Sequence, residues 1–136
     1  MQLGVRRSSH LILSCVIVVV SLFSQIARAA DTGDLAAAWK DADKLSKTPI
    51  GNKYELEFFP AIAQTLADAV RNCGGSDKKP YKFDMVLFVS ADGHIIRSLY
   101  PPNQPIAACI AAKLKGKKGP RPPRDSWPVG ARFDNK

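Results

Sequence analysis

Hydrophobic and polar positions alternate along residues 82–100, and this alternation predicts a β-hairpin. Apolar side chains recur at every second position in residues 83–89, and a second alternating run covers residues 95–100. Asp92 and Gly93 separate the two runs, and an Asp-Gly pair favours the two-residue hairpin loop that needs positive φ. Residues 83–89 are also apolar on their second face, so we expect a central strand that is covered on both faces. The second run is expected to divide strictly between two faces, with Ile95, Arg97 and Leu99 on one and Ile96, Ser98 and Tyr100 on the other.

Two helices are predicted before the hairpin. Apolar residues at helical spacing predict the first over residues 31–47, with Trp39 as a core anchor. Residues 49–52, Pro-Ile-Gly-Asn, are expected to break it. The second helix is expected from near residue 58 to residue 72, with Pro60 in its first turn, where the missing N–H of proline is tolerated.

A third helix and a third strand are predicted after the hairpin. Helical spacing covers residues 104–115, Asn103 is a suitable cap, and Pro105 falls in the first turn. Near the end of the chain the apolar side chains alternate again, at Val129, Ala131 and Phe133. The predicted fold class is therefore α+β, a small antiparallel three-stranded sheet packed by helices.

Residues 1–29 have the three parts of a secretory signal peptide. The first ten residues carry two arginines and no acid, residues 11–23 are almost wholly apolar, and residues 27–29 have the small-x-small pattern Ala-Arg-Ala. The alternative is an uncleaved membrane anchor, but the apolar run is shorter than the roughly 20 residues that a spanning helix needs. We therefore expect cleavage after Ala29 and a mature chain in the periplasm.

The expected mature chain, residues 30–136, is short and carries two cysteines. Cleavage leaves 107 of the 136 residues, which suits one domain with one modest core. It also removes three arginines and no acid, so the formal net charge falls from +8 to +5. An even cysteine count in a secreted chain favours a disulfide, here between Cys73 and Cys109. Metal binding and thiol catalysis are the alternatives, although the chain has no C-x-x-C motif.

Residues 113–124 form a basic segment rich in glycine and proline, K-L-K-G-K-K-G-P-R-P-P-R. This composition predicts an extended surface loop, and dense positive charge attracts anionic partners. The cations predicted to bind a partner are Lys115, Lys117, Lys118, Arg121 and Arg124. The alternative is a solvated loop that only keeps the protein soluble. In the periplasm the expected anions are lipopolysaccharide, anionic lipid and acidic protein faces, and no nucleic acid is expected.

The sequence offers no convincing set of catalytic residues. Ser90, Asp92 and His94 have the residue types of a triad, but they surround one exposed turn that cannot enclose a substrate. Glu55 and Glu57 are interpreted as part of a solvated face and not as an acid pair. Phosphate-binding loops, nucleotide fingerprints and His-rich metal motifs do not occur in the chain. We therefore expect a non-enzymatic protein without metal or other cofactor.

The order of these features resembles the TonB C-terminal-like domain family, in particular its cysteine-containing subgroup. The similar features are Ala-Val-Arg-Asn-Cys at residues 69–73, the Asp-Gly hairpin, Ala-Ala-Cys-Ile at residues 107–110, and the Pro-rich segment before the last strand. The resemblance covers roughly residues 69–133 and leaves the first predicted helix as an extra element. It implies the TonB C-terminal-like fold, pairing of the two cysteines and binding of protein partners.

Two functions fit these expectations. The first is a periplasmic binding module, similar to a detached TonB C-terminal domain, whose exposed sheet edge accepts a partner strand. The alternative is an inhibitor or immunity protein that neutralises a secreted effector enzyme. Force transmission as in TonB is not expected, because that role needs an uncleaved membrane helix and a long Pro-rich linker. Where the subgroup has an aromatic Trp-x-Phe-Pro segment, this chain has Lys-Lys-Gly-Pro at residues 117–120.

Overall fold

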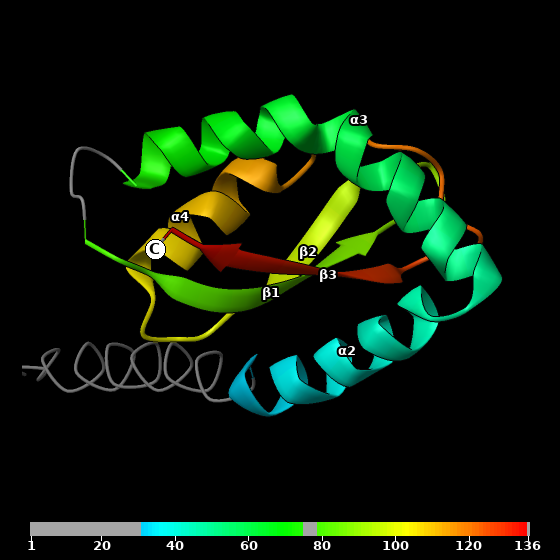
Figure 1. Cartoon of the computed structure of the whole chain (residues 1–136), viewed down its shortest axis with the longest axis horizontal. Coiled ribbons are helices and arrows are strands. Elements are labelled where there is room, and N and C mark those ends of the chain that lie inside the picture. Colours follow the sequence, from blue (N-terminus) through cyan, green and yellow to red (C-terminus); the bar gives the residue numbers. More distant parts are fainter. Residues whose placement is uncertain (1–30, 75–78, 136) are drawn as a thin grey trace, which may run out of the picture. The chain divides into compact units, whose positions relative to one another are not determined.

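The computed structural model describes residues 31–74 and 79–135, and the expected signal peptide lies outside them (Figure 1). The elements follow one another in this order: α2 (Asp31–Ser46), α3 (Pro49–Gly74), β1 (Lys82–Val89), β2 (Ile95–Leu99), α4 (Pro105–Leu114) and β3 (Trp127–Asp134). This is the predicted α+β class, with three helices and a three-stranded antiparallel sheet. Over the described ranges, no helix combines the length and the apolar character that crossing a membrane requires.

β1 is the central strand of the sheet, whose order is β2-β1-β3. It pairs with β3 along its whole length, from Lys82 opposite Asp134 to Val89 opposite Trp127. The three successive side chains of residues 85–87 are all 0% exposed. Since neighbouring strand residues point to opposite faces, both faces of β1 are covered, as predicted.

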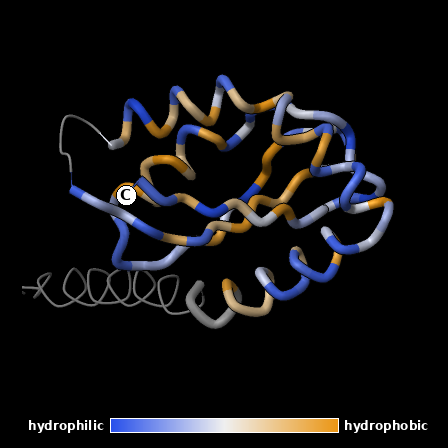
Figure 2. The backbone as a smooth tube through the Cα atoms, in the orientation of Figure 1, coloured by the Kyte–Doolittle hydropathy of each residue, from blue (hydrophilic) through white to orange (hydrophobic). Residues whose placement is uncertain are grey.

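Helices cover the two faces of this sheet (Figure 1). α3 and α4 share one core with the strands, and its fully buried members include Phe58, Ile62, Met85, Leu87, Ile110, Leu114 and Val129. α2 contacts all three strands on the opposite face. There Trp39 lies against Gly130, where an added Cβ would be 3.1 Å from the indole ring. Figure 2 shows hydrophobic residues concentrated in the strands and mixed with hydrophilic ones along the helices.

α3 begins at Pro49, so the prediction that this helix starts near Phe58 is wrong. The hydroxyl of Thr48 accepts a hydrogen bond from the backbone N–H of Gly51 at 3.0 Å, which is the arrangement of an N-cap residue. Pro49 then occupies the first helical position, where its fixed φ is favourable and its missing N–H costs nothing. Residues 49–52, which were expected to break the first helix, therefore form the first turn of the second.

Pro60 lies inside α3 and not in its first turn. A proline there removes one backbone hydrogen bond and crowds the preceding turn, which bends a helix. Figure 1 shows α3 changing direction between its first and second halves. The bend directs the second half of α3 along the sheet beside β3.

A β-bulge places Ile95 on the face opposite to the predicted one. Val89 pairs with Ile95, whereas Phe88 pairs with Arg97, so Ile96 is an extra residue in β2. Paired residues share a face, so Ile95 lies on the core side with Val89, and Arg97 lies on the other side with Phe88. The extra residue interrupts the two-residue period from which the faces were predicted.

The hairpin loop is longer than the predicted two-residue loop. The Ser90 N–H donates to the His94 carbonyl at 2.9 Å, and the Gly93 N–H donates to the Ser90 carbonyl at 2.8 Å. Three residues therefore lie between the two that close the loop. Gly93 has a φ of 93°, as expected for a residue that needs positive φ.

We expect Gly93→Ala to destabilise the fold more than Gly116→Ala does. Both glycines have positive φ, at 93° and 79°, which costs an alanine about 1–2 kcal/mol. A Cβ at Gly93 would also lie 2.4 Å from the Gly119 carbonyl oxygen, whereas a Cβ at Gly116 would meet nothing within 4 Å. Forced backbone shifts add about 1–3 kcal/mol at Gly93 alone. Urea unfolding measures the loss of stability in each variant. Equal losses would show that residues 119 and 120 do not pack on the hairpin turn at Gly93.

The disulfide joins Cys73 at the end of α3 to Cys109 in α4, as predicted, with a Cα–Cα distance of 5.7 Å. Both cysteines are half-buried. α4 starts at Pro105, and Gln104 precedes it without a side-chain capping hydrogen bond. The prediction that Asn103 caps this helix is therefore wrong, since the chain enters α4 one residue later. The disulfide holds α3 and α4 together on one face of the sheet.

Candidate functional site

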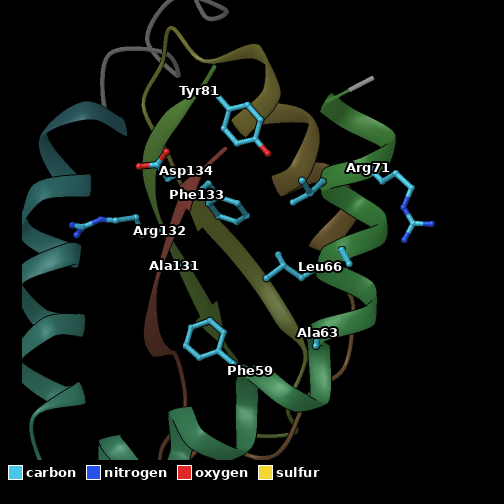
Figure 3. A pocket seen from close by; sticks show the side chains of 11 residues that line it. Phe59, Ala63, Leu66, Arg71, Tyr81, Ala131, Arg132, Phe133 and Asp134 are labelled. Carbon is cyan, nitrogen blue, oxygen red and sulfur yellow. The ribbon is translucent and has the colours of Figure 1, made fainter. Parts of the chain in front are cut away.

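An open groove with a volume of about 780 Å³ lies between the second half of α3 and β3 (Figure 3). Most of its lining is apolar and comes from Phe59, Ala63, Leu66, Ala67, Val70, Tyr81, Ala131 and Phe133. In Figure 3, Phe59 and Leu66 point from α3 towards the groove, whereas Arg71 and Arg132 point away from it on opposite sides. The groove is thus an apolar channel with cations at its rim.

Aromatic stacking builds the floor of this groove. The rings of Phe83 and Phe133 are stacked with their centroids 4.9 Å apart, and the ring of Tyr81 lies 5.9 Å from that of Phe83. On the α3 side, Phe59, Leu66 and Val70 are only partly buried. The apolar stripe of α3 therefore includes side chains that the fold leaves partly open to solvent.

The backbone of β3 forms the other side of the groove. Within the part of the chain that the structure describes, β3 pairs only with β1, so its outer edge has no neighbouring strand. Pro128 near the start of β3 lacks an N–H, which limits pairing there. Residues 131–134, at the other end of β3, line the groove. An extended segment lying in the groove would therefore run beside an unpaired strand edge.

The two arginines at the rim are already held by carboxylates. The Arg132 guanidinium donates to Asp84 at 2.7 and 3.2 Å and lies 5.4 Å from the ring centroid of Trp39. Arg71 lies 3.3 Å from Asp68. Both arginines are exposed, so these pairs contribute little stability. Each of these cations is balanced by a carboxylate, and neither arginine seals the groove.

The basic segment is exposed at its side chains but packed at its backbone. The side chains of Lys115, Lys117, Lys118, Arg121 and Arg124 are all exposed. The backbone is tied to the hairpin, because the Ile95 N–H donates to the Lys117 carbonyl at 2.9 Å and the Gly119 N–H donates to the Gly93 carbonyl at 2.8 Å. Pro122 in the same segment is buried. The predicted extended surface loop is therefore part of the fold, and its cations project from a fixed backbone.

Tyr54 anchors this segment from α3. Its hydroxyl donates to the Pro120 carbonyl at 3.1 Å, and its ring lies edge-on to Trp127 with centroids 5.8 Å apart. Burial raises the pKa of the Tyr54 hydroxyl to about 12. Beside it, Gly119 lies so close to Phe58 that an added Cβ would be 3.1 Å from the ring. No pattern in the sequence indicated these contacts, which join residues more than sixty positions apart.

Tyr54→Phe is expected to lower the free energy of unfolding by about 0.5–1.5 kcal/mol, because it removes one hydrogen bond and keeps the ring. Tyr100→Phe is the matched control, since the Tyr100 hydroxyl makes no hydrogen bond to the described residues. In the parent protein, the unfolded chain ionises Tyr54 near pH 10 while the folded chain resists ionisation until about pH 12. Stability should therefore fall from pH 10 towards 12, and Tyr54→Phe should lose less over this range. If the parent and Tyr54→Phe lost the same free energy of unfolding between pH 10 and pH 12, the hydrogen bond of the Tyr54 hydroxyl would be contradicted.

The structure brings Ser90, Asp92 and His94 together, but not as a catalytic triad. The Ser90 hydroxyl donates to one oxygen of Asp92, and His94 Nδ1 lies 2.9 Å from the other. Hydrogen bonds from Ser90 and then His94 hold the pKa of the Asp92 carboxyl low, at about 2. In a triad the histidine bridges the serine and the acid. Here the carboxylate takes the central place, so these residues order the turn.

Neither acid pairs nor metal ligands gather elsewhere in the described residues. Glu55 and Glu57 lie in α3, where residues two apart do not face each other. Burial, with a further contribution from Asp43, raises the pKa of Glu55, which is half-buried, whereas Glu57 is exposed. No group of three or more potential metal ligands occurs in residues 31–74 and 79–135. The groove beside β3 is therefore the best-formed candidate site.

Comparison of the chain with protein-family models, with curated proteins and with solved structures finds no match.

Proposed function

We propose that this chain is a non-enzymatic binding module that accepts an extended segment of a partner protein in the groove between α3 and β3. The observation that carries the proposal is the combination of an unpaired β3 edge with an open apolar groove of about 780 Å³. A strand edge supplies main-chain hydrogen bonds to an added strand, and an adjacent groove supplies specificity through alternate side chains. The proposed partner segment is apolar at every second position.

The length of the open edge limits the bound segment. β3 has eight residues, and Pro128 occupies its second position. The part of the strand that lines the groove is Ala131–Asp134, so an added strand would place about two apolar side chains over the groove at a two-residue period. Phe59 and Leu66 on α3 would face these side chains. A contact surface of this length fits a short linear segment of the partner.

The TonB C-terminal-like assignment is part of the same proposal. It is supported by the order helix, hairpin, helix and strand, and by the disulfide between the two helices. The additional helix α2 lies on the other face of the sheet and leaves the groove open. We also propose that the partner belongs to the periplasm or is secreted, in line with the expected leader at residues 1–29.

The test is selection of peptides from a displayed library on the full chain, followed by mapping of the bound peptide by amide hydrogen exchange. Selected peptides should show alternating apolar residues and should protect the amides of β3. Ala63→Glu and Ala67→Glu place a charge in the groove lining and should weaken binding at least about tenfold. The matched control is Ala61→Glu, an exposed residue of α3 that does not line the groove.

Other outcomes would assign the protein differently. Peptides that bind equally well to Ala63→Glu and Ala61→Glu would overturn the groove proposal. Tight binding of a folded enzyme with loss of its activity, unaffected by the groove variants, would favour an inhibitor or immunity protein. The groove variants change exposed residues, so unchanged thermal unfolding distinguishes lost binding from lost folding.

A further inference from the structure

Residues 93–124 contain seven lysines and arginines and not one acid. This segment includes β2, α4 and the basic segment, which begins in the last turn of α4. The side chains of all seven cations are exposed. None of them forms an ion pair with another described residue. The positive charge of this region is therefore not neutralised within the fold.

Backbone contacts bring the segment that carries most of these cations against the start of β2. The Gly116 N–H donates to the Ile95 carbonyl at 2.7 Å, which brings the basic segment against the start of β2. Arg97 of β2 and Lys115 after α4 line one hollow of about 250 Å³. We call this surface the basic edge, and its cations are Arg97, Lys113, Lys115, Lys117, Lys118 and Arg121.

Carboxylates near this surface are already engaged, and Asp92 of the turn is held by Ser90 and His94. Asp68 of α3 shares a small hollow with Lys113 and Lys117. It lies 3.3 Å from Arg71 and accepts a hydrogen bond from Gln64 at 3.1 Å. The cations of the basic edge thus remain available to an external anion.

We propose that the basic edge docks this protein on a membrane surface that carries anionic phospholipids. Clustered lysine and arginine side chains bind such surfaces through the surface potential of the lipids. Fixed backbone hydrogen bonds hold the cations of the loop in one array, so little loop entropy is lost on binding. The assignment rests on charge complementarity between a surface with many more cations than acids and a surface that carries phosphates.

Two features favour a lipid surface over a nucleic acid. Ile96, the extra residue of the bulge, is 45% exposed and lies in the same hollow as Arg97 and Lys115. An apolar side chain among cations suits the boundary between headgroups and acyl chains. In contrast, Tyr100 is the only Phe, Tyr or Trp in the whole acid-free segment and is half-buried. Single-stranded nucleic acids bind on exposed aromatic platforms, which this edge does not offer.

The strand order separates this surface from the groove. β2 and β3 are the two outer strands of the sheet, on either side of β1. A molecule docked through the basic edge would keep the groove beside β3 directed away from the lipid. Because the two surfaces lie at opposite edges, each can be tested without the other.

The test measures co-flotation of the full chain with vesicles of phosphatidylcholine alone or mixed two to one with phosphatidylglycerol. The test variant replaces Lys115, Lys117, Lys118 and Arg121 with glutamine. The charge-matched control replaces Lys40, Lys44, Lys53 and Lys79, which are exposed and lie outside the basic edge. The apolar residues 11–23 are common to all variants, and the vesicles without anionic lipid measure their contribution.

We expect the test variant to lose at least about tenfold in affinity for the anionic vesicles at low salt, and the control to lose much less. Ile96→Thr should weaken the same binding, whereas Ile50→Thr, at another exposed isoleucine, should not. Melting temperatures of all four variants should remain near that of the parent, which separates binding from folding. Equal losses in the two charge variants would overturn the proposal, because net charge alone would then explain them. Tighter binding to an oligonucleotide than to the vesicles, at equal phosphate and salt concentration, would also overturn it.

Discussion

Replacing both Cys73 and Cys109 with serine is expected to lower the free energy of unfolding by about 2–5 kcal/mol. The two cysteines are separated by 36 positions. In the chain-entropy description, a crosslink over a loop of this length lowers the conformational entropy of the unfolded state. This raises the free energy of the unfolded state by about 4 kcal/mol. The bond also joins α3 to α4, so the double variant loses the covalent link between the two helices of the main core. Urea unfolding monitored by circular dichroism measures the change.

The single variants and the reduced parent protein provide the controls. Cys73→Ser, Cys109→Ser and the double variant should lose similar amounts, because each removes the same crosslink. Reduction of the parent should reproduce most of that loss, since it breaks the bond without changing the side-chain volume. Two thiols that react readily in the folded, unreduced protein would contradict the disulfide.

Leu87→Ala is expected to lower the free energy of unfolding by about 2–5 kcal/mol, because it opens a cavity in the core. Leu87 is 0% exposed at the centre of β1 and belongs to the core shared by the sheet, α3 and α4. Phe83→Ala in the same strand should cost about 3–5 kcal/mol and should also disturb the floor of the groove, where its ring stacks on Phe133.

Leu56→Ala is the matched control for Leu87→Ala. The chemical change is identical, but Leu56 is 72% exposed on α3 and should alter stability by no more than about 0.5 kcal/mol. Equilibrium unfolding in urea compares the two variants directly. A loss at Leu56 as large as that at Leu87 would mean that this face of α3 is covered in solution, for example by a second copy of the chain.

The patterns that depend on near neighbours were predictable from the sequence. Two-residue alternation placed β1, and its apolar residues on both faces identified it as the central strand. The two cysteines of the expected mature chain favoured a disulfide, which forms between Cys73 and Cys109. These predictions were correct because strand periodicity and cysteine number can be read from the sequence without knowing which distant residues are in contact.

Local signals failed where one residue type serves two purposes. Pro49 is typical of a loop and equally typical of a first helical turn, and the structure uses it, after the cap residue Thr48, as the start of α3. Ile96 continues an apolar alternation in the sequence but is the extra residue of a bulge. The neighbouring Ile95 bonds to Gly116 and Lys117 on the outer side of β2, a pairing that spans more than twenty residues and has no local signature.

The candidate surfaces depended most on the tertiary structure. Apolar periodicity marks Phe59, Leu66 and Val70 as one stripe of a helix, but it cannot state how closely that helix approaches the sheet. The bend at Pro60 and the aromatic floor beneath α3 leave these side chains over an open groove instead of a closed core. The sequence alone likewise determined that residues 93–124 are basic and free of acids. Only the backbone hydrogen bonds between the basic segment and the hairpin decided that these cations form one edge, because non-local pairing sets where a loop lies.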